Sequence, residues 1–418
     1  MDTFYEKVKE RMIRYAKINS QSMAKSPTAP STMIQFTIAD HLVDELKSIG
    51  VENVSLSKEC VIFGTIPSNL PNDRKCLSLG LVAHMDTTPD VTGTDVKPWI
   101  YENYPGGDVV LNKEKHIVME ESAYPNLKQF IGQDIIFSDG TTLLGADDKA
   151  GLAEIMTMAE YLIAHPEISH GPIQIGITPD EEVGRGAENF DVEKFGADIA
   201  YTVDGDTTGI YGYETFNAAE ADLTIHGLNV HPGYAKDIML NAIEIGGEFM
   251  EMLPAFERPQ YTKEREGHFH PFTFNGTVEK CEIRCLIRDH DLDHYYQRKA
   301  YVEKCVDMLN HKYGDNTVEL SYDNIYFSML REVEKVPFMI DYLVEAIESE
   351  GIEAKAVAFR GGTDGSVLSQ KGLPCPNINS GFQNGHSRFE FVPIQQMVIN
   401  TKILLKLVSK LKYIDTKL

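Results

Sequence analysis

Apolar residues recur at helical spacing in four parts of the chain. Near the N-terminus they stand among charged residues at Phe4, Val8, Met12, Tyr15 and Ile18. Residues 31–50 have the same period, and Ser31 or Thr32 can cap a helix that Gly50 ends. The spacing predicts two further helices over residues 148–164 and 393–412.

Three short runs of consecutive apolar residues predict strands. They cover residues 77–83, 173–178 and 199–203. Runs of this length are typical of strands that are buried on both faces of a mostly parallel sheet. Because they alternate with helical patterns, the sequence predicts an α/β fold with a mostly parallel sheet. Residues 88–131 are expected to form a long excursion outside its core.

The middle of the chain has another pattern, in which polar and apolar residues alternate as they do in half-exposed strands. The predicted elements are a strand at 216–226, a helix near 239–253, a strand at 278–288, a helix at 291–313 and a strand near 317–322. Such elements would fit the order β-α-β-β-α-β of a small α+β sandwich of the ferredoxin-like type. We therefore expect an inserted domain at 215–328 within an α/β domain formed by 1–214 and 329–418.

Length and charge limit the classes of protein to which this chain can belong. The chain has 418 residues, more than the ~250–300 over which one core usually grows, which supports two domains. It carries 63 acidic against 39 basic residues, a net charge of −24. This balance argues against a nucleic-acid-binding protein, which needs a basic stripe. It also argues against docking on anionic lipid, and most of the acidity is expected to be ordinary solvated surface.

The sequence indicates a cytoplasmic protein. No apolar run approaches the ~18 residues of a membrane span, and the first residues do not form a signal peptide. The six cysteines are scattered, without the paired CxxC units of a zinc ribbon. In a chain of this length they are typical of reduced thiols in a core.

Acids and histidines follow the predicted strands directly. The strand at 77–83 is followed by an HMD sequence, that at 173–178 by PDEE, and that at 199–203 by DGD. A weaker strand near 374–379 leads to a further histidine, and the helix at 148–164 begins with acids. Because ligands bind at the carboxyl ends of parallel strands, we expect these side chains to converge. The residues concerned are His84, Asp86, Asp147, Glu181, Glu182, Asp204 and His386.

Converging carboxylates repel one another unless cations neutralise them. Carboxylate with imidazole is a ligand set of zinc, and it also suits manganese or cobalt. In the His84-x-Asp86 pair, one side chain can bind a metal while the other orients it. In the Glu181–Glu182 pair, one can bind a metal while the other acts as a base. Each motif alone has an ordinary explanation, such as chance, a helix cap or a solvated loop, but their joint occurrence favours a two-metal hydrolase.

Eight short motifs, in order along the chain, resemble a known family. They are AHMDT (83–87), GADDKAG (145–151), TPDEEVGRGA (178–187), YTVDG (201–205), NVHPG (229–233), IRD (287–289), RGGTDG (360–365) and GLPCPN (372–377). The sequence resembles the dinuclear-zinc aminopeptidase/carboxypeptidase/aminoacylase family, and within it the peptidase T branch. The resemblance implies a zinc aminopeptidase that removes the N-terminal residue from tripeptides.

The resemblance also implies roles for the converging residues. Two zinc ions are expected per subunit, with manganese or cobalt as alternatives, and Asp147 is expected to bridge them. His84 and Asp204 are implied to complete one site, and Glu182 and His386 the other. Glu181 resembles the general base, and Asp86 the residue that orients His84. The Asp147–Asp148 peptide bond is expected to be cis, as in the family.

The inserted domain is implied to be a lid that also serves dimerisation. Its His231 resembles a residue that stabilises the oxyanion, with a packed histidine as the alternative. Arg288 and Arg360 are expected to bind the substrate's carboxylate or backbone, and a structural pair with Asp289 or Asp291 is the alternative for Arg288. His268-x-His270 has the spacing of metal ligands, but we expect it in a surface loop.

One position departs from the peptidase T pattern, since Phe389 stands where a second histidine is usual. This puts the local contacts in doubt, but not the ligand His386. A dipeptidase or amidohydrolase of the same family is the alternative enzyme. A non-catalytic peptide-binding homologue is the alternative of another class, which the complete set of ligands and Glu181 disfavours. Small peptides are the expected partners, with neither nucleic acid nor membrane.

Overall fold

The computed structural model describes residues 2–71 and 76–412. Contacts divide them into two compact units. The first is formed by the chain up to Tyr213, by Met329–Val357 and by the chain from Thr363 onward. The second is formed by Glu214–Ser328 with Ala358–Gly362, so residues 358–362 do not lie in the unit to which the sequence assigned them.

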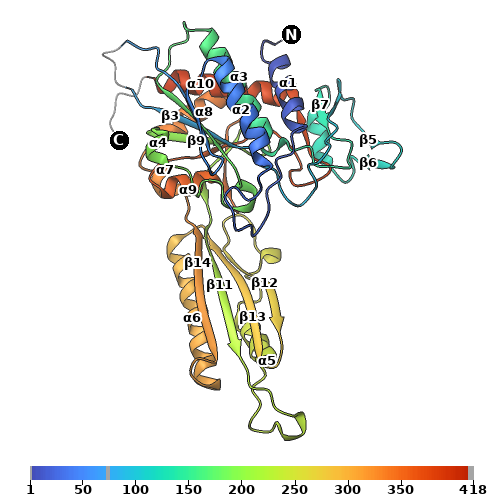
Figure 1. The fold of residues 1–418 in the computed structure, drawn as a ribbon, viewed down its shortest axis with the longest axis vertical. Coiled ribbons are helices and arrows are strands. Elements are labelled where there is room, and N and C mark those ends of the chain that lie inside the picture. The colour runs from blue at the N-terminus through green and yellow to red at the C-terminus, as the bar shows by residue number, and fades with distance from the viewer. Residues whose placement is uncertain (1, 72–75, 413–418) are drawn as a thin grey trace. The chain divides into compact units, whose positions relative to one another are not determined.

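An eight-stranded sheet forms the centre of the first unit (Figure 1). In spatial order its strands are β1 (Glu52–Leu56), β2 (Ile62–Ile66), β8 (Ile173–Thr178), β3 (Leu79–His84), β9 (Ile199–Val203), β16 (Asn377–Ile378), β10 (Ile210–Thr215) and β15 (Lys355–Phe359). The neighbours β8, β3, β9 and β16 run parallel. Strands β1, β2 and β10 pair antiparallel. The prediction of an α/β fold with a mostly parallel sheet is confirmed.

Helices cover both faces of this sheet, which explains its continuous apolar strands. The main core includes residues from α1 (Tyr5–Ala16), α2 (Gln35–Ile49), α3 (Ala146–Ala164), α8 (Phe338–Glu348) and α10 (Ile394–Leu411). A second, smaller apolar core combines other residues of the strands with residues from α4 (Val192–Phe195) and α9 (Asp364–Gln370). A short helix, α7 (Leu330–Val333), lies near α9.

The predicted helix at 31–50 begins later than expected. Its first helical residue is Gln35, whereas Ser31 and Thr32 precede the helix and do not cap it. The Ser31 backbone N–H and hydroxyl instead donate to Asp180. Gly50 ends the helix in the left-handed conformation (φ 97°), as predicted.

The excursion at 88–131 forms small sheets of its own. Strand β4 (Trp99–Tyr101) pairs with β7 (Ile135–Phe137), which also pairs with β17 (Phe391–Pro393). Strands β5 (Val109–Asn112) and β6 (Ile117–Met119) form a hairpin, and a 3₁₀ helix, η1, covers Pro125–Phe130. Most of the segment's apolar residues share a separate cluster outside the main core, as predicted, whereas Val96 belongs to the main core.

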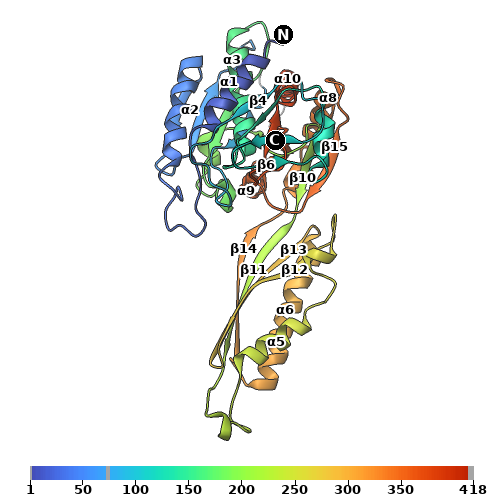
Figure 2. The same cartoon turned by 90° about the vertical axis from the view of Figure 1, so that its right-hand side faces the viewer.

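The second unit is an α+β sandwich. Its antiparallel sheet has the order β12 (His268–Gly276), β13 (Lys280–Asp289), β11 (Asn217–His226) and β14 (Val318–Tyr326). Helices α5 (Ala242–Met252) and α6 (Leu292–Tyr313) cover one face of the sheet, as Figure 2 shows. Short 3₁₀ helices stand at Pro232–Tyr234 (η3) and Pro259–Tyr261 (η4).

Strand β12 corrects one expectation. His268 and His270 lie in this strand and not in a surface loop, and His268 is buried. The segment HFHPFTFNG contains a proline and an asparagine, which weaken the strand pattern. The register with β13 shifts between Pro271 and Thr273, and such an irregularity accommodates a proline in a strand.

The six cysteines do not form disulfides with one another, and all of them except Cys76 are buried. No helix among residues 2–71 and 76–412 has both the length and the apolar character that crossing a membrane requires.

Candidate metal centre

Four parallel strands and one helix carry the predicted metal ligands to one edge of the first unit. His84 is the last residue of β3, and Asp204 follows β9 directly. Glu182 lies in the 3₁₀ turn Glu181–Val183 (η2), which follows β8. His386 lies in the loop between β16 and β17, and Asp147 stands in the first turn of α3. The adjacent strand ends explain why residues so distant in sequence converge.

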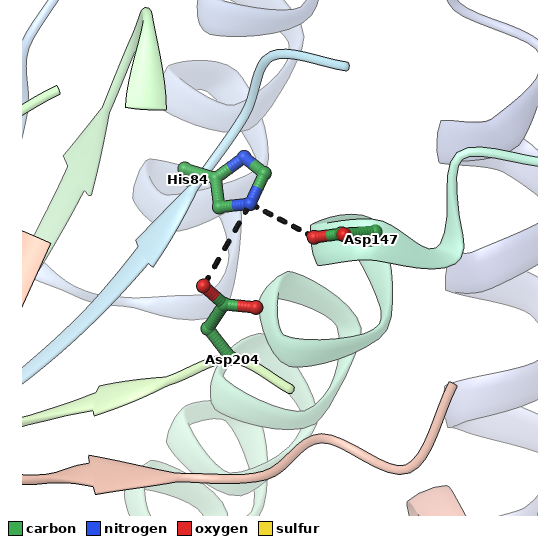
Figure 3. Close-up of side chains that lie close together, drawn as sticks. All are labelled: His84, Asp147 and Asp204. Atoms are coloured by element: carbon green, nitrogen blue, oxygen red, sulfur yellow. Dashed lines mark hydrogen bonds and ion pairs between the residues drawn. The ribbon is translucent and has the colours of Figure 1, made fainter. Parts of the chain in front are cut away.

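The first group consists of His84, Asp147 and Asp204 (Figure 3). His84 Nε2 lies 3.1 Å from Asp147 Oδ1 and 4.0 Å from Asp204 Oδ2. Figure 3 shows the two carboxylates on the same side of the ring, both facing this nitrogen. One donor atom from each residue lies within 4.8 Å of the others, which is close enough to hold one metal ion.

The second group consists of Asp147, Glu182 and His386. His386 Nε2 lies 2.7 Å from Glu182 Oε2 and 3.5 Å from the other oxygen of Asp147, Oδ2. The carboxylate of Asp147 therefore faces both groups, one oxygen to each. This is the arrangement of a ligand that bridges two metal ions.

Asp147 owes its position to an irregular start of α3. Gly145 precedes it in the left-handed conformation (φ 77°), and neither Asp147 nor Asp148 has helical backbone angles. The Asp147–Asp148 peptide bond is cis, as the resemblance implied.

The electrostatics of these groups favour positive charge. Burial, together with the acids around them, raises the pKa of Asp204 to about 8 and that of Glu182 to about 7. Hydrogen bonds with Asp147 and Glu182 raise the pKa of His386 to about 11. Burial opposes the charge on His84, but its hydrogen bonds with Asp147 and Asp86 raise its pKa well above the ordinary value.

The donor set fits divalent metal ions. Glu182 has a side chain that is 3 % exposed, and its buried Oε1 has no hydrogen-bond partner among the described residues. A buried oxygen without a partner is costly, and a bound cation removes that cost. Imidazole and carboxylate ligands suit zinc, manganese or cobalt, so the chemistry of the donors leaves the metal open.

Asp86 joins the first ligand to the turn of the two glutamates. Its carboxylate accepts hydrogen bonds from the backbone N–H groups of Glu181 (3.0 Å) and Glu182 (3.2 Å). Its main-chain oxygen lies 3.1 Å from Nδ1 of His84, closer than its carboxylate at 3.4 Å. The main chain of Asp86 thus makes the closer contact with the His84 ring, and the side chain holds the glutamates.

Glu181 lies beside the two groups without belonging to either. Burial raises its pKa well above the ordinary value, and the charges of Asp204, Asp364 and Glu182 act in the same direction. A carboxylate with this property can accept a proton near neutral pH.

Glu390 is a site residue that the sequence analysis did not single out. Its buried carboxylate accepts three backbone hydrogen bonds, from Leu144 (3.1 Å), Gly145 (2.6 Å) and Asp147 (2.8 Å). It therefore holds the turn that presents Asp147. Its one sequence signal is its place four residues after His386, which by itself does not indicate this contact.

Asp364 is a second such residue. It is buried, and its Oδ2 accepts a hydrogen bond of 2.6 Å from the hydroxyl of Thr178, the last residue of β8. A Cβ atom on Gly186 would lie 2.2 Å from Asp364 Oδ1, so only glycine fits there. Asp364 thus packs against the segment that follows the glutamate turn.

Comparison with known proteins decides the family. Peptidase T of Clostridium novyi is 49 % identical over 404 residues, which cover 97 % of this chain and 99 % of the relative. The chain belongs to the peptidase T family. A model of the peptidase dimerisation domain also matches residues 213–317, which include most of the second unit.

Solved structures share the fold of this family member. The aminopeptidase PepT from Bacillus cereus aligns with a TM-score of 0.77 at 21 % identity, covering 97 % of this chain and 98 % of that one. A tripeptidase from Staphylococcus aureus aligns with a TM-score of 0.76 at 21 % identity, covering 98 % of each chain. The α/β fold with an inserted α+β domain, predicted from the sequence, is confirmed.

The remaining predicted residues of this peptidase T family member lie in the second unit. His231 is exposed and precedes η3, and its Nδ1 accepts a hydrogen bond of 3.1 Å from the Gly233 N–H. A neutral ring with this contact carries its proton on Nε2, which can then act as a donor. A packed histidine, the alternative considered for this residue, does not agree with its exposure.

Arg288 and Arg360 are neighbours with different surroundings. Arg288 lies on β13 and donates to the Arg360 carbonyl (3.3 Å), and its buried Nε has no partner among the described residues. Asp289 pairs with Arg298 (2.7 Å) and Asp291 caps α6, so the suggested pair of Arg288 with either acid is not present in the described part of the chain.

Arg360 is instead bound to its own unit. Its guanidinium donates to the carbonyl oxygens of Glu264 (2.7 Å) and Glu266 (2.9 Å) and to the hydroxyl of Thr262 (2.8 Å). It also lies over the ring of Phe216, at 5.1 Å from the centroid. These contacts stabilise the segment before β12, and they occupy donors that a substrate carboxylate requires.

Phe389, which departs from the peptidase T pattern, contacts the excursion. Its ring lies 5.0 Å from that of Tyr124, between the centroids, in a tilted arrangement. The loop of His386 is further joined to the excursion by Asn126, which donates to Gln383 and Asn384 at 3.1 Å each. An aromatic contact has thus taken the place where the pattern has a second histidine.

Proposed function

We propose that this protein is a metal-dependent aminopeptidase that removes the N-terminal residue from tripeptides. The observation that carries the proposal is the pair of ligand groups that share Asp147, with Glu181 beside them. The substrate class is supported by the family, whose curated relatives are named peptidase T, and by the likeness to a tripeptidase from Staphylococcus aureus.

Two zinc ions are the proposed cofactors, with manganese or cobalt as alternatives. His84, Asp147 and Asp204 would hold one ion, and Asp147, Glu182 and His386 the other. When bound, such a pair polarises the scissile carbonyl and lowers the pKa of the attacking water.

Glu181 is the proposed general base. The hydrogen bond from its N–H to Asp86 fixes its backbone, and its raised pKa suits a group that takes and returns a proton. It accepts the proton of the attacking water and then delivers it to the nitrogen of the leaving amine. Asp86 positions both His84 and Glu181 for this exchange.

The residues of the second unit are proposed for substrate contacts. His231 donates from Nε2 to the oxygen that becomes negative in the tetrahedral intermediate. Arg288 binds the substrate's carboxylate, since a guanidinium matches a carboxylate in shape and charge. Arg360 supports Arg288 through its carbonyl oxygen, and its own contact with substrate is the less favoured part of this proposal.

Dimerisation and location complete the proposal. The match to the peptidase dimerisation domain supports a homodimer formed through residues 215–328. Cysteines that form no disulfides are those expected of a protein in the reducing cytoplasm.

A turnover panel of di-, tri- and tetrapeptides, each free and N-acetylated, tests the function. We expect the free tripeptides to be cleaved at least tenfold faster than the others, with zinc and with manganese. Blocked peptides that are cleaved as fast as free ones would exclude an aminopeptidase. A preference for dipeptides would favour the dipeptidase alternative.

A further inference from the structure

The residue before the general base has an unusual backbone. Asp180 joins strand β8 to the glutamate turn with φ 57° and ψ 20°, the left-handed region that residues other than glycine rarely adopt. Its carbonyl oxygen accepts hydrogen bonds from Arg185 (2.9 Å) and Val183 (3.4 Å), which close the turn. A backbone in this region persists only where its surroundings hold it.

Gln35, the first residue of α2, holds Asp180 at two points. Its Nε2 donates to Asp180 Oδ1 (2.6 Å), and its Oε1 accepts from the Asp180 N–H (3.2 Å). Ser31 adds two donors, its N–H to Asp180 Oδ2 (2.6 Å) and its hydroxyl to Oδ1. Gln35 is fully buried and Asp180 nearly so. Both ends of the amide and both oxygens of the carboxylate are therefore used.

The glutamate turn is thus held from two sides. On one side, Asp86 accepts from the N–H groups of Glu181 and Glu182. On the other, Gln35 and Ser31 bind Asp180, from a segment about 145 residues earlier in the chain. The contact with Asp86 alone fixes the N–H groups, but it does not fix the rotation of the turn about them. The contact with Gln35 supplies that second constraint.

We propose that Gln35 is a positioning residue for this centre, which sets the placement of Glu181 and Glu182 through Asp180. This inference rests on the proposed function. It has a selective consequence, because Glu182 belongs to only one of the two ligand groups. Loss of Gln35 therefore weakens one metal site and the proton transfer by Glu181, while the group of His84, Asp147 and Asp204 is retained.

The test is Gln35→Met, which keeps the volume of the side chain and removes both contacts with Asp180. Chelator-treated protein is titrated with Zn²⁺ by calorimetry, and turnover is measured on a free tripeptide. We expect one of two binding events to weaken by about 10–100-fold and the other to keep its affinity. We expect kcat to fall at least tenfold while KM changes less than twofold.

Gln174→Met is the matched control. Gln174 lies on β8, the strand that leads to Asp180, at the end remote from that residue, where it accepts from Thr65 (2.7 Å) and donates to Ser78 (3.3 Å). The Gln174→Met variant should leave both Zn²⁺-binding events and kcat unchanged. If Gln35→Met does not fold, Ser31→Ala is the second variant, because it removes one hydrogen-bond donor to the carboxylate of Asp180. It should weaken the same single Zn²⁺-binding event, but by a smaller factor.

Two outcomes overturn the inference about Gln35. One is unchanged binding and kcat in Gln35→Met. The other is equal weakening of both binding events together with a lower melting temperature, which indicates a merely structural role. If the reference protein itself binds no Zn²⁺ at two sites, the proposed function fails, and this result is distinct from either.

Discussion

At the scale of single residues, the two neighbouring glutamates have different surroundings. The side chain of Glu182 lies 2.7 Å from His386, within a group of ligands. Glu181 lies outside both groups. The sequence placed both residues after the same strand, but only the folded turn at Glu181–Val183 shows that Glu182 joins a ligand group and that Glu181 does not.

Glu181→Ala should retain the metal ions and the fold and lose turnover. Removal of a general base typically costs 10²–10⁴-fold in rate, so we expect kcat to fall in that range. Zn²⁺ content measured by atomic absorption should stay at that of the reference protein. Glu193→Ala, an exposed glutamate of α4, is the control. A variant that keeps near-normal kcat would show that another group takes the proton.

A second residue-scale feature is the buried Glu154 of α3. Its Oε1 accepts from the amide of Asn400 (3.3 Å), while its Oε2 and the Asn400 Oδ1 have no partner among the described residues. Burial raises the pKa of Glu154 well above its ordinary value. A protonated Glu154 can donate from Oε2, which suits the unpaired oxygen of Asn400.

The sign of the pH dependence follows from this raised pKa. Glu154 stabilises the fold at low pH, and that contribution is lost as the pH rises above about 4.3, the value in the unfolded chain, through the higher pKa of the folded state. Glu154→Gln mimics the protonated form. We expect its melting temperature to exceed that of the reference protein by several degrees at pH 9 and to equal it near pH 4.5.

Glu160→Gln, on the same helix, is the control with the opposite sign. Glu160 pairs with Arg11 and Lys7, and these contacts, against burial, lower its pKa. Its contribution is present above the unfolded value and is lost as the pH falls. Glu160→Gln should therefore lower the stability of the folded protein at neutral pH, and this difference from the reference protein should disappear in acid. Parallel curves for the two variants would contradict the assignment of Glu154.

At the scale of elements, the start of α3 is held by a side chain that comes much later in the sequence. The backbone of Asp147 and Asp148 is not helical, and the first N–H groups of a helix have no partner within the helix itself. The carboxylate of Glu390 accepts three backbone hydrogen bonds at this point, from Leu144, Gly145 and Asp147. Glu390 lies just before β17, in the loop that also carries His386. One loop therefore carries His386 and holds the turn of Asp147, which faces both candidate ligand groups.

Glu390→Gln should weaken both metal sites, because Asp147 belongs to both. The amide has the same shape, but in place of one carboxylate oxygen it presents an NH2 group, which cannot accept a hydrogen bond from a backbone N–H. We expect both Zn²⁺ affinities to fall about 10–100-fold in calorimetry, in contrast to the single event affected by Gln35→Met. Glu345→Gln, an exposed residue of α8, is the control. Loss of only one binding event would show that Glu390 does not act through Asp147.

At the scale of the whole molecule, the acids fall into two classes. Most of the 63 acidic residues are not part of the candidate metal centre. The excess of acidic over the 39 basic residues gives the chain its net charge of −24. A few at the strand ends form the centre, where burial raises their pKa values. Cations that bind there bind the folded chain and not the unfolded one, so they stabilise the fold by mass action.

Removal of metal should therefore change activity and stability together. We expect a chelator to abolish turnover and to lower the melting temperature, and Zn²⁺, Co²⁺ or Mn²⁺ to restore both. A concentration of 100 times Kd corresponds to about 2.7 kcal/mol for one site. Differential scanning calorimetry with an added metal series measures it. Full activity after exhaustive chelation would refute the two-metal centre.

Local sequence patterns predicted most of the fold and most of the residues of the candidate metal centre. Apolar runs found the central strands, and helical spacing found α1, α3 and α10, because both follow from which faces a chain must bury. Adjacent parallel strands bring their carboxyl ends together, so the converging acids and histidines could be predicted as one centre. Strand β12 was missed because its alternation is weak, and its pairing with β13 is a contact that a local pattern does not show.

Only the tertiary structure decided what holds the centre in place. That Asp147 faces both ligand groups, that Glu390 holds its turn, and that Gln35 binds Asp180 are contacts between residues far apart in sequence. The hydrogen bonds that occupy Arg360 are of the same kind. Hydrophobic periodicity reports which side of an element is buried. It does not report which polar group from elsewhere satisfies a buried donor, and that pairing exists only once the chain has folded.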